Sequence, residues 1–200
     1  MIQLQRDATT GEFKRTISVS RPAGQGSRAS VNPEFTLNNG GETFHFIAPE
    51  DWSRIYNTAP LLKEGINGSG VSIAVVGADS RVQLSDIRTF RRIFELPDND
   101  PELIINGIDP GIIAFSAAEE EADLDIEWSG AIAPHAHIKF VTSASTASTN
   151  GFDLSLAHIV DNRLAPIMSV SIGGCELFFG PEGNAFLNGI YRQAVSEGMT

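Results

Sequence analysis

The sequence predicts an α/β fold with a parallel central sheet. Its first support is "VSIAVVGAD" (71–79), a nearly continuous β-branched and apolar run that is typical of a strand buried on both faces of such a sheet. Its second support is the alternation of strand-like and helix-like segments from residue 71 onward, as in other α/β proteins. The sequence ends just after a predicted helix, where the alternation calls for another strand. We therefore expect a sheet that is truncated on its C-terminal side.

The predicted elements follow this alternation in order. A helix begins at Pro49 in "PEDWSRIYN", with acidic residues in its first turn, where they favour the helix dipole. The segment "LSDIRTFRRIFEL" predicts a second helix with Ser85 as its N-cap and an apolar stripe made of Ile87, Phe90, Ile93 and Phe94. A strand "HIKFVTSA", a helix "FDLSLAHIVDNRL", a strand "PIMSVSIGG" and a helix "NAFLNGIYRQAVSEGM" complete the series.

The composition indicates a globular domain with an N-terminal appendage. Hydrophobic residues make up 42% of the chain and charged residues 20%, which distinguishes it from disordered sequences. Residues 1–46 are rich in Gly, Ser, Thr, Asn and Arg, so we predict a tail or linker there and a domain over 47–200. No apolar run approaches the roughly 20 residues that span a bilayer, and we expect no membrane contact.

The charge is unevenly distributed along the chain. The net charge is −11, and residues 1–46 hold five Lys/Arg against four Asp/Glu, whereas residues 47–200 hold nine against twenty-one. So acidic a domain argues against nucleic-acid binding, which depends on basic residues that neutralise phosphates. Cys175 is the single cysteine, so no internal disulfide can form, and we expect it to be a structural thiol.

The segment "AEEEADLDIEW" places six carboxyl groups between Glu119 and Glu127. Acids four residues apart in this run, Glu121 and Asp125 among them, would share one face of a helix, where two close carboxyl groups can titrate as a coupled pair. The usual explanation of an acidic run is a solvated helix face. We expect that explanation to hold for the remaining acids of the run, and we expect no metal ion there, because the side chains point around the helix.

Several segments match one family in its own order, namely "FIAPEDWSRIYN", "GSGVSIAVVGADS", "NGIDPG", "EADLDIEWSGAIAP", "DNRLAPIMSVSIGGCE" and "GNAFLNGIYRQAVSEG". Through them the chain from about residue 46 resembles the sedolisins, serine-carboxyl peptidases that share the subtilisin fold. The resemblance implies a subtilisin-like three-layer fold. It implies that residues 1–46 are the end of an activation propeptide with a linker, and that residues 47–200 are the N-terminal part of the catalytic domain.

The same resemblance implies roles for individual residues. Sedolisins carry an E-x-x-L-D motif, which implies that Glu121 is the general base and Asp125 its partner. The segment Ser171, Ile172 and Gly173 would bind the substrate backbone by β-pairing. The nucleophilic serine of the family lies in a Gly-Thr-Ser motif, which these 200 residues do not contain. A glutamate base suits acid conditions, because its ordinary pKa of about 4.3 leaves it ionised where histidine is already protonated.

Further implications concern cofactor, partners and location. The resemblance implies a calcium site with ligands beyond residue 200, secretion to the extracellular space, a monomer, and a protein or peptide substrate together with the chain's own propeptide as partners. Without a Gly-Thr-Ser serine we expect the 200-residue chain to be inactive. The alternative is a non-catalytic binding module or pseudoenzyme on the same fold. It draws support from "GGCELFFGPEG", which lacks the aspartate that the resemblance to sedolisins implies shortly after this strand to stabilise an oxyanion.

Two competing interpretations receive less support from the residues. Asp79 could be the aspartate of an Asp-His-Ser subtilisin, but no His-Gly motif follows it in the chain. His135 and His137 could bind a metal ion, but no third ligand is evident beside them, and we expect surface histidines.

Overall fold

The computed structural model describes residues 2–6, 13–17, 35–39 and 42–200. By its internal contacts the chain divides into two compact units, Met1–Gly65 and Ile66–Thr200. The boundary that we predicted after residue 46 falls inside the first unit, and it stays a prediction.

The described residues of the first unit form two antiparallel strand pairs and two short helices: β1 (Ile2–Arg6) with β2 (Phe13–Ile17), β3 (Phe35–Asn39) with β4 (Glu42–Phe46), then α1 (Pro49–Ile55) and α2 (Ala59–Lys63). The sequence predicted a tail or linker over residues 1–46 and did not predict these strand pairs. Antiparallel strand pairs satisfy their backbone groups locally, and the polar composition of this region does not reveal them. The helix start at Pro49 is confirmed, and the Asp51 carboxylate in its first turn accepts the Ala48 N–H at 3.0 Å.

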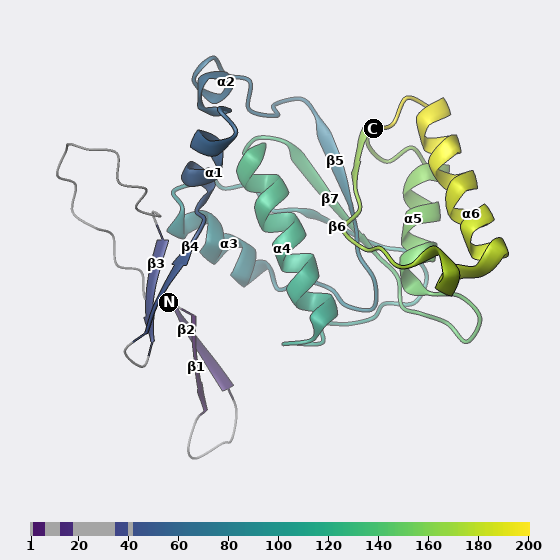
Figure 1. Cartoon of the computed structure of the whole chain (residues 1–200), viewed down its shortest axis with the longest axis horizontal. Coiled ribbons are helices and arrows are strands. Elements are labelled where there is room, and N and C mark those ends of the chain that lie inside the picture. The colour runs from purple at the N-terminus through teal and green to yellow at the C-terminus, as the bar shows by residue number, and fades with distance from the viewer. Residues whose placement is uncertain (1, 7–12, 18–34, 40–41) are drawn as a thin grey trace. The chain divides into compact units, whose positions relative to one another are not determined.

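The second unit is built on a four-stranded parallel sheet (Figure 1). Its strand order is β6-β7-β5-β8, and all three neighbouring pairs are parallel. The strands are β5 (Ser72–Val76), β6 (Glu102–Ile105), β7 (His137–Thr142) and β8 (Ile167–Ser169). This arrangement confirms the predicted α/β fold with a parallel central sheet.

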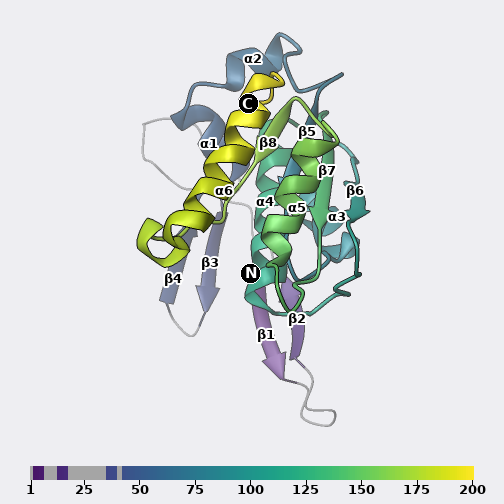
Figure 2. The same ribbon diagram turned by 90° about the vertical axis from the view of Figure 1, so that its right-hand side faces the viewer.

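Four helices cover the two faces of this sheet. In Figures 1 and 2, α3 (Leu84–Ile93) and α4 (Ala117–Ile132) lie on one side, and α5 (Gly151–Asp161) and α6 (Glu176–Ser196) lie on the other. Alternate residues of β5 separate the two cores, because successive strand side chains point to opposite faces. Val75 packs with Ile87, Ile126 and Phe140, whereas its neighbours Ala74 and Val76 pack with α5 residues such as Leu156 and Ile159. The unit is thus a three-layer α/β/α sandwich.

Two glycines allow close packing beside the carboxyl ends of β5 and β7. A Cβ on Gly77, just after β5, would lie 2.2 Å from the Phe140 ring, and a Cβ on Gly151 would lie 2.2 Å from the Ser143 carbonyl oxygen. Gly77 therefore leaves room for the largest fully buried side chain of the core. Gly151 lets α5 begin directly against the segment that follows β7.

Four details differ from the predicted elements. The four-residue strand β6 was not predicted, because a short edge strand carries little periodic signal. The N-cap of α3 is Gln83 and not Ser85, because the chain already turns into the helix at Leu84. Strand β8 ends at Ser169, although we expected it to reach Gly174. Helix α6 begins at Glu176, earlier than predicted, and includes a kink at Gly180, where φ is 65°.

The outer edge of β8 forms two backbone hydrogen bonds with Thr200. Thr200 N–H donates to the Pro166 carbonyl at 2.9 Å, and Met168 N–H donates to the Thr200 carbonyl at 2.8 Å. Among the described residues, no helix combines the length and the apolar character that crossing a membrane requires.

Candidate functional site

The chain segments that follow β5, β7 and β8 meet at the carboxyl edge of the sheet, the edge at which open α/β sheets bind ligands. Two of these segments are joined by Asp79, whose carboxylate accepts the Ser145 N–H at 2.5 Å and the Ser145 hydroxyl at 2.7 Å. The Ser145 Oγ in turn accepts the Gly151 N–H at 2.9 Å. These bonds give Asp79 a structural role in tying the two segments together.

Helix α4 brings carboxyl groups to this edge from two different faces. The helix begins at Ser116, whose side chain accepts the Glu119 N–H at 3.1 Å and acts as the N-cap. Each residue advances the helix by about 100°, so residues two positions apart point in nearly opposite directions. Glu119 and Asp123 therefore face the core on α4, whereas Glu121 and Asp125 occupy the other side and are half-buried.

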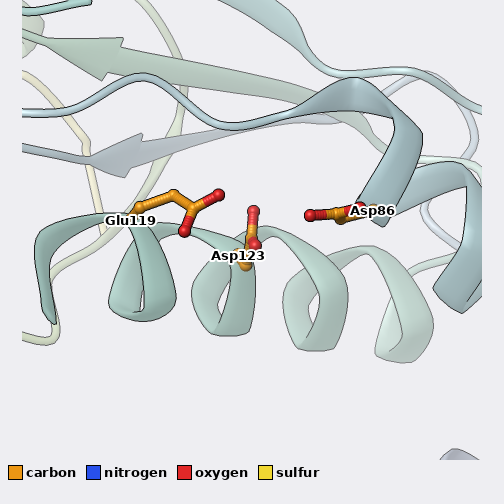
Figure 3. Close-up of side chains that lie close together, drawn as sticks. All are labelled: Asp86, Glu119 and Asp123. Carbon is orange, nitrogen blue, oxygen red and sulfur yellow. The ribbon is translucent and has the colours of Figure 1, made fainter. Parts of the chain in front are cut away.

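The core-facing acids contradict the expected solvated run. Glu119 is 2% exposed and Asp123 is 6% exposed, and Figure 3 shows both side chains directed toward Asp86 of α3. Oxygen atoms of the three carboxyl groups lie within 4.8 Å of one another. The expectation was wrong because these two acids fall on the same stripe as the buried Ala122 and Ile126. That spacing was present in the sequence and could have predicted their burial.

Three carboxyl groups at this spacing are the kind of oxygen ligands that hard cations take. However, the Glu119 carboxylate already accepts the Phe115 N–H at 2.9 Å and the Gln83 side-chain N–H at 3.4 Å. Because Glu119 is held by protein donors, we assign no ion to this cluster. The two histidines that could have suggested a metal pair are exposed, and His137 instead lies 3.3 Å from the Glu102 carboxylate.

The second face of α4 is connected to the predicted substrate segment. The Ser171 hydroxyl donates a hydrogen bond of 2.6 Å to Asp125 Oδ1, which joins residues 46 positions apart. Burial raises the pKa of the Asp125 carboxyl group, and the hydrogen bond from Ser171 acts in the opposite direction. Sequence reasoning proposed all three residues Glu121, Asp125 and Ser171, but it did not predict this contact.

Glu121 lies one turn before Asp125 on the same half-buried side of the helix. Within the described residues, no hydrogen bond joins the Glu121 and Asp125 carboxyl groups. The coupling between the two carboxyl groups stays a prediction from their spacing.

The remaining predicted substrate residues, Ile172 and Gly173, are exposed. They follow Ser169, the last residue of β8 that pairs with β5. The residues expected to pair with a peptide thus lie beyond the strand, on a segment without regular secondary structure, and not inside the strand. Cys175, which follows them, is an exposed free thiol.

A cavity of about 530 Å³ lies elsewhere, at the C-terminal half of α3 and the loop after it. Arg91, which lines it, donates to the Pro134 carbonyl in the loop before β7, and Asn99 donates to the Ala136 carbonyl there. The cavity is therefore at the amino edge of the sheet, away from Asp125 and Ser171.

The second unit is thus a parallel three-layer α/β/α sandwich in which Asp125 of α4 contacts Ser171 of the segment after β8. In a comparison with solved structures, the chain is similar to one described as Pseudomonas sedolisin (serine-carboxyl proteinase) complexed with two molecules of pseudo-iodotyrostatin. The TM-score is 0.57 at 18% sequence identity, and the match covers 67% of this chain and 38% of that one. No family model and no curated protein sequence matches. At this identity the similarity shows the subtilisin-like fold alone.

Proposed function

We propose that this chain supplies the acid–base part of a serine-carboxyl endopeptidase of the sedolisin type. The observation that carries the proposal is the hydrogen bond between Asp125 on α4 and Ser171 beside β8. It joins one of the two acids of the E-x-x-L-D segment to the segment expected to bind peptide, at the carboxyl edge of a subtilisin-like sheet.

In the proposed mechanism, Glu121 removes the proton from a serine hydroxyl that attacks the peptide carbonyl. A serine hydroxyl is a weak nucleophile until a base removes its proton. Asp125 would act as the partner of Glu121, because it lies one turn later on the same side of α4. The attack forms an acyl-enzyme, which water then hydrolyses. An extended peptide would pair with the backbone of residues 171–173.

The chain spans 38% of the sedolisin structure that it matches, so the activity belongs to the proposal. None of the 200 residues forms a Gly-Thr-Ser segment, so the proposal assigns the nucleophile to no residue of this chain, and we expect no turnover from the 200-residue chain alone. A calcium site outside these residues, a propeptide in residues 1–46, secretion and a monomeric state are parts of the same proposal.

The test is a peptidase assay at about pH 4 on the complete gene product, comparing E121Q with E120Q. Glu120 is the adjacent acid and is exposed, so E120Q controls for the loss of one charge. We expect E121Q to lower kcat by about three orders of magnitude or more, as loss of other triad members does, and E120Q to leave it unchanged. Near-normal turnover by E121Q would refute the role of Glu121.

The alternative is a non-catalytic binding module on the same fold. The absence of a hydrogen bond between Glu121 and Asp125 within the described structure favours it, because a binding module needs no shared proton. A complete gene product that binds peptides but cleaves none at any pH would support this alternative over the peptidase.

A further inference from the structure

Among the described contacts, one side-chain hydrogen bond joins the segment that follows β8 to α4. Ser171 is exposed and lies two residues beyond the end of β8, yet its hydroxyl is 2.6 Å from Asp125 Oδ1. A distance of 2.5–2.7 Å is typical of a hydroxyl that donates to an ionised carboxylate. The bond therefore identifies Ser171 as a donor that favours the charged form of Asp125.

Burial and the hydrogen bond act on Asp125 in opposite directions. Removal from water disfavours the carboxylate and raises the pKa of Asp125, while the Ser171 hydroxyl lowers it. The two segments that meet here carry further titratable groups, namely Glu119, Glu120, Glu121, Asp123 and Glu127 on α4, and Cys175 and Glu176 after β8. None of them is among the causes of the Asp125 pKa shift, so the Ser171 hydroxyl is the group that offsets burial.

The same bond restricts the geometry of the carboxyl group. With Oδ1 held by Ser171, the Asp125 side chain cannot rotate freely, and Oδ2 is left as the oxygen that could accept from Glu121. The bond also fixes the start of the segment whose backbone would pair with a peptide. The Ser171 hydroxyl thus positions both the Asp125 carboxylate and the segment that we expect to bind peptide.

We propose that Ser171 is a positioning residue of the site: its hydroxyl orients the Asp125 carboxylate and ties the peptide-binding segment to the acid–base helix. This inference rests on the proposed function, because it gives Ser171 a role in that reaction. It does not make Ser171 the nucleophile, since the acid that it contacts is the predicted partner and not the predicted base.

The first experiment needs no catalysis. The pH titration of the Asp125 side-chain carboxyl carbon is followed by NMR in the 200-residue chain, for the wild type, S171A, S171T and the control S169A. Ser169 lies two residues earlier in the same segment and makes no side-chain hydrogen bond among the described contacts. We expect S171A to raise the pKa of Asp125, S171T to restore it because the hydroxyl is retained, and S169A to leave it unchanged.

The second experiment measures the complete gene product. Loss of a hydrogen bond to a charged group, about 1.5–3 kcal/mol, corresponds to a decrease of about 10- to 150-fold in kcat/KM for S171A. We also expect the acid limb of its pH profile to move to higher pH, and S171T to recover both. An unchanged Asp125 titration in S171A, or a profile that S171T does not restore, would overturn the inference. If E121Q did not reduce turnover, the proposed function would be refuted, but the NMR titration of Asp125 would be unaffected. The failure of the proposed function and the failure of this inference can therefore be distinguished.

Discussion

Arg91 on α3 provides the sharpest test of how this unit is held together. Its side chain is 3% exposed and donates to the carbonyl oxygens of Pro97 at 2.6 Å, Gly130 at 3.1 Å and Pro134 at 2.9 Å. In a regular helix the Gly130 carbonyl of α4 would accept from the residue four positions later, but that residue is Pro134, which has no N–H. Arg91 therefore replaces a missing helical donor and places a positive charge near the C-terminus of α4.

The perturbation is Arg91→Met, which keeps most of the side-chain volume and removes the donors. The Gly130 carbonyl would be left buried without its donor, at a cost of about 1–3 kcal/mol, and each of the other two hydrogen bonds contributes about 0.5–1.5 kcal/mol. Pro97 is exposed and can be rehydrated, Pro134 keeps a bond from Asn99, and removal of a buried charge recovers some desolvation energy. We expect a net loss of about 2–4 kcal/mol in the free energy of unfolding.

The matched control is Arg88→Met, one turn earlier on the same helix. The Arg88 side chain is 61% exposed and pairs with the Asp100 carboxylate, and an exposed pair of this kind contributes little to stability because water screens it. The assay is urea unfolding followed by far-UV circular dichroism, with the midpoints compared at a constant m-value. If Arg91→Met is no more destabilising than Arg88→Met, the assignment of Arg91 as the donor that completes α4 is wrong.

Two further substitutions test the carboxyl edge of the sheet. Gly151→Ala would place a Cβ 2.2 Å from the Ser143 carbonyl oxygen and should cost about 1–3 kcal/mol, whereas Gly189→Ala, with nothing within 4 Å in α6, should gain about 0.5–1 kcal/mol. Equal midpoints of thermal unfolding for these two variants would contradict the close approach. Asp125→Asn tests the raised pKa of Asp125. Because the Asp125 carboxyl group binds its proton more tightly in the folded state, it stabilises the protein below its ordinary pKa of 3.8. This contribution is lost as the pH rises through the folded-state pKa. We therefore expect Asp125→Asn to be more stable than the wild type at pH 7 by about 1 kcal/mol or less, given its partial exposure, and to lose this advantage in acid. The urea midpoints of both proteins across the pH range check this, with Glu120→Gln as the control, and an advantage that grows in acid would exclude the assigned direction.

Local periodicity determined much of the sheet and its helices. The apolar run of β5 could be read directly, because a strand buried on both faces needs apolar side chains at every position. Pro49 marked the start of α1 because proline is tolerated in the first turn of a helix. The E-x-x-L-D spacing likewise places Glu121 and Asp125 on one side of α4, because residues four positions apart lie on the same face of any helix.

The tertiary structure decided what each of those side chains contacts. A helix brings Glu121 and Asp125 to the same side in any sequence context, but only the path of the chain after β8 brings Ser171 to Asp125, across 46 residues. The stripe on α4 that holds Glu119 and Asp123 was present in the sequence, but their approach to Asp86 of α3 depends on how the two helices pack, which no local pattern specifies. Secondary structure follows from short-range sterics and hydrogen bonding, whereas these contacts depend on how the layers of the sandwich pack together. The candidate residues could therefore be predicted from the sequence, but the side chains that they contact could not.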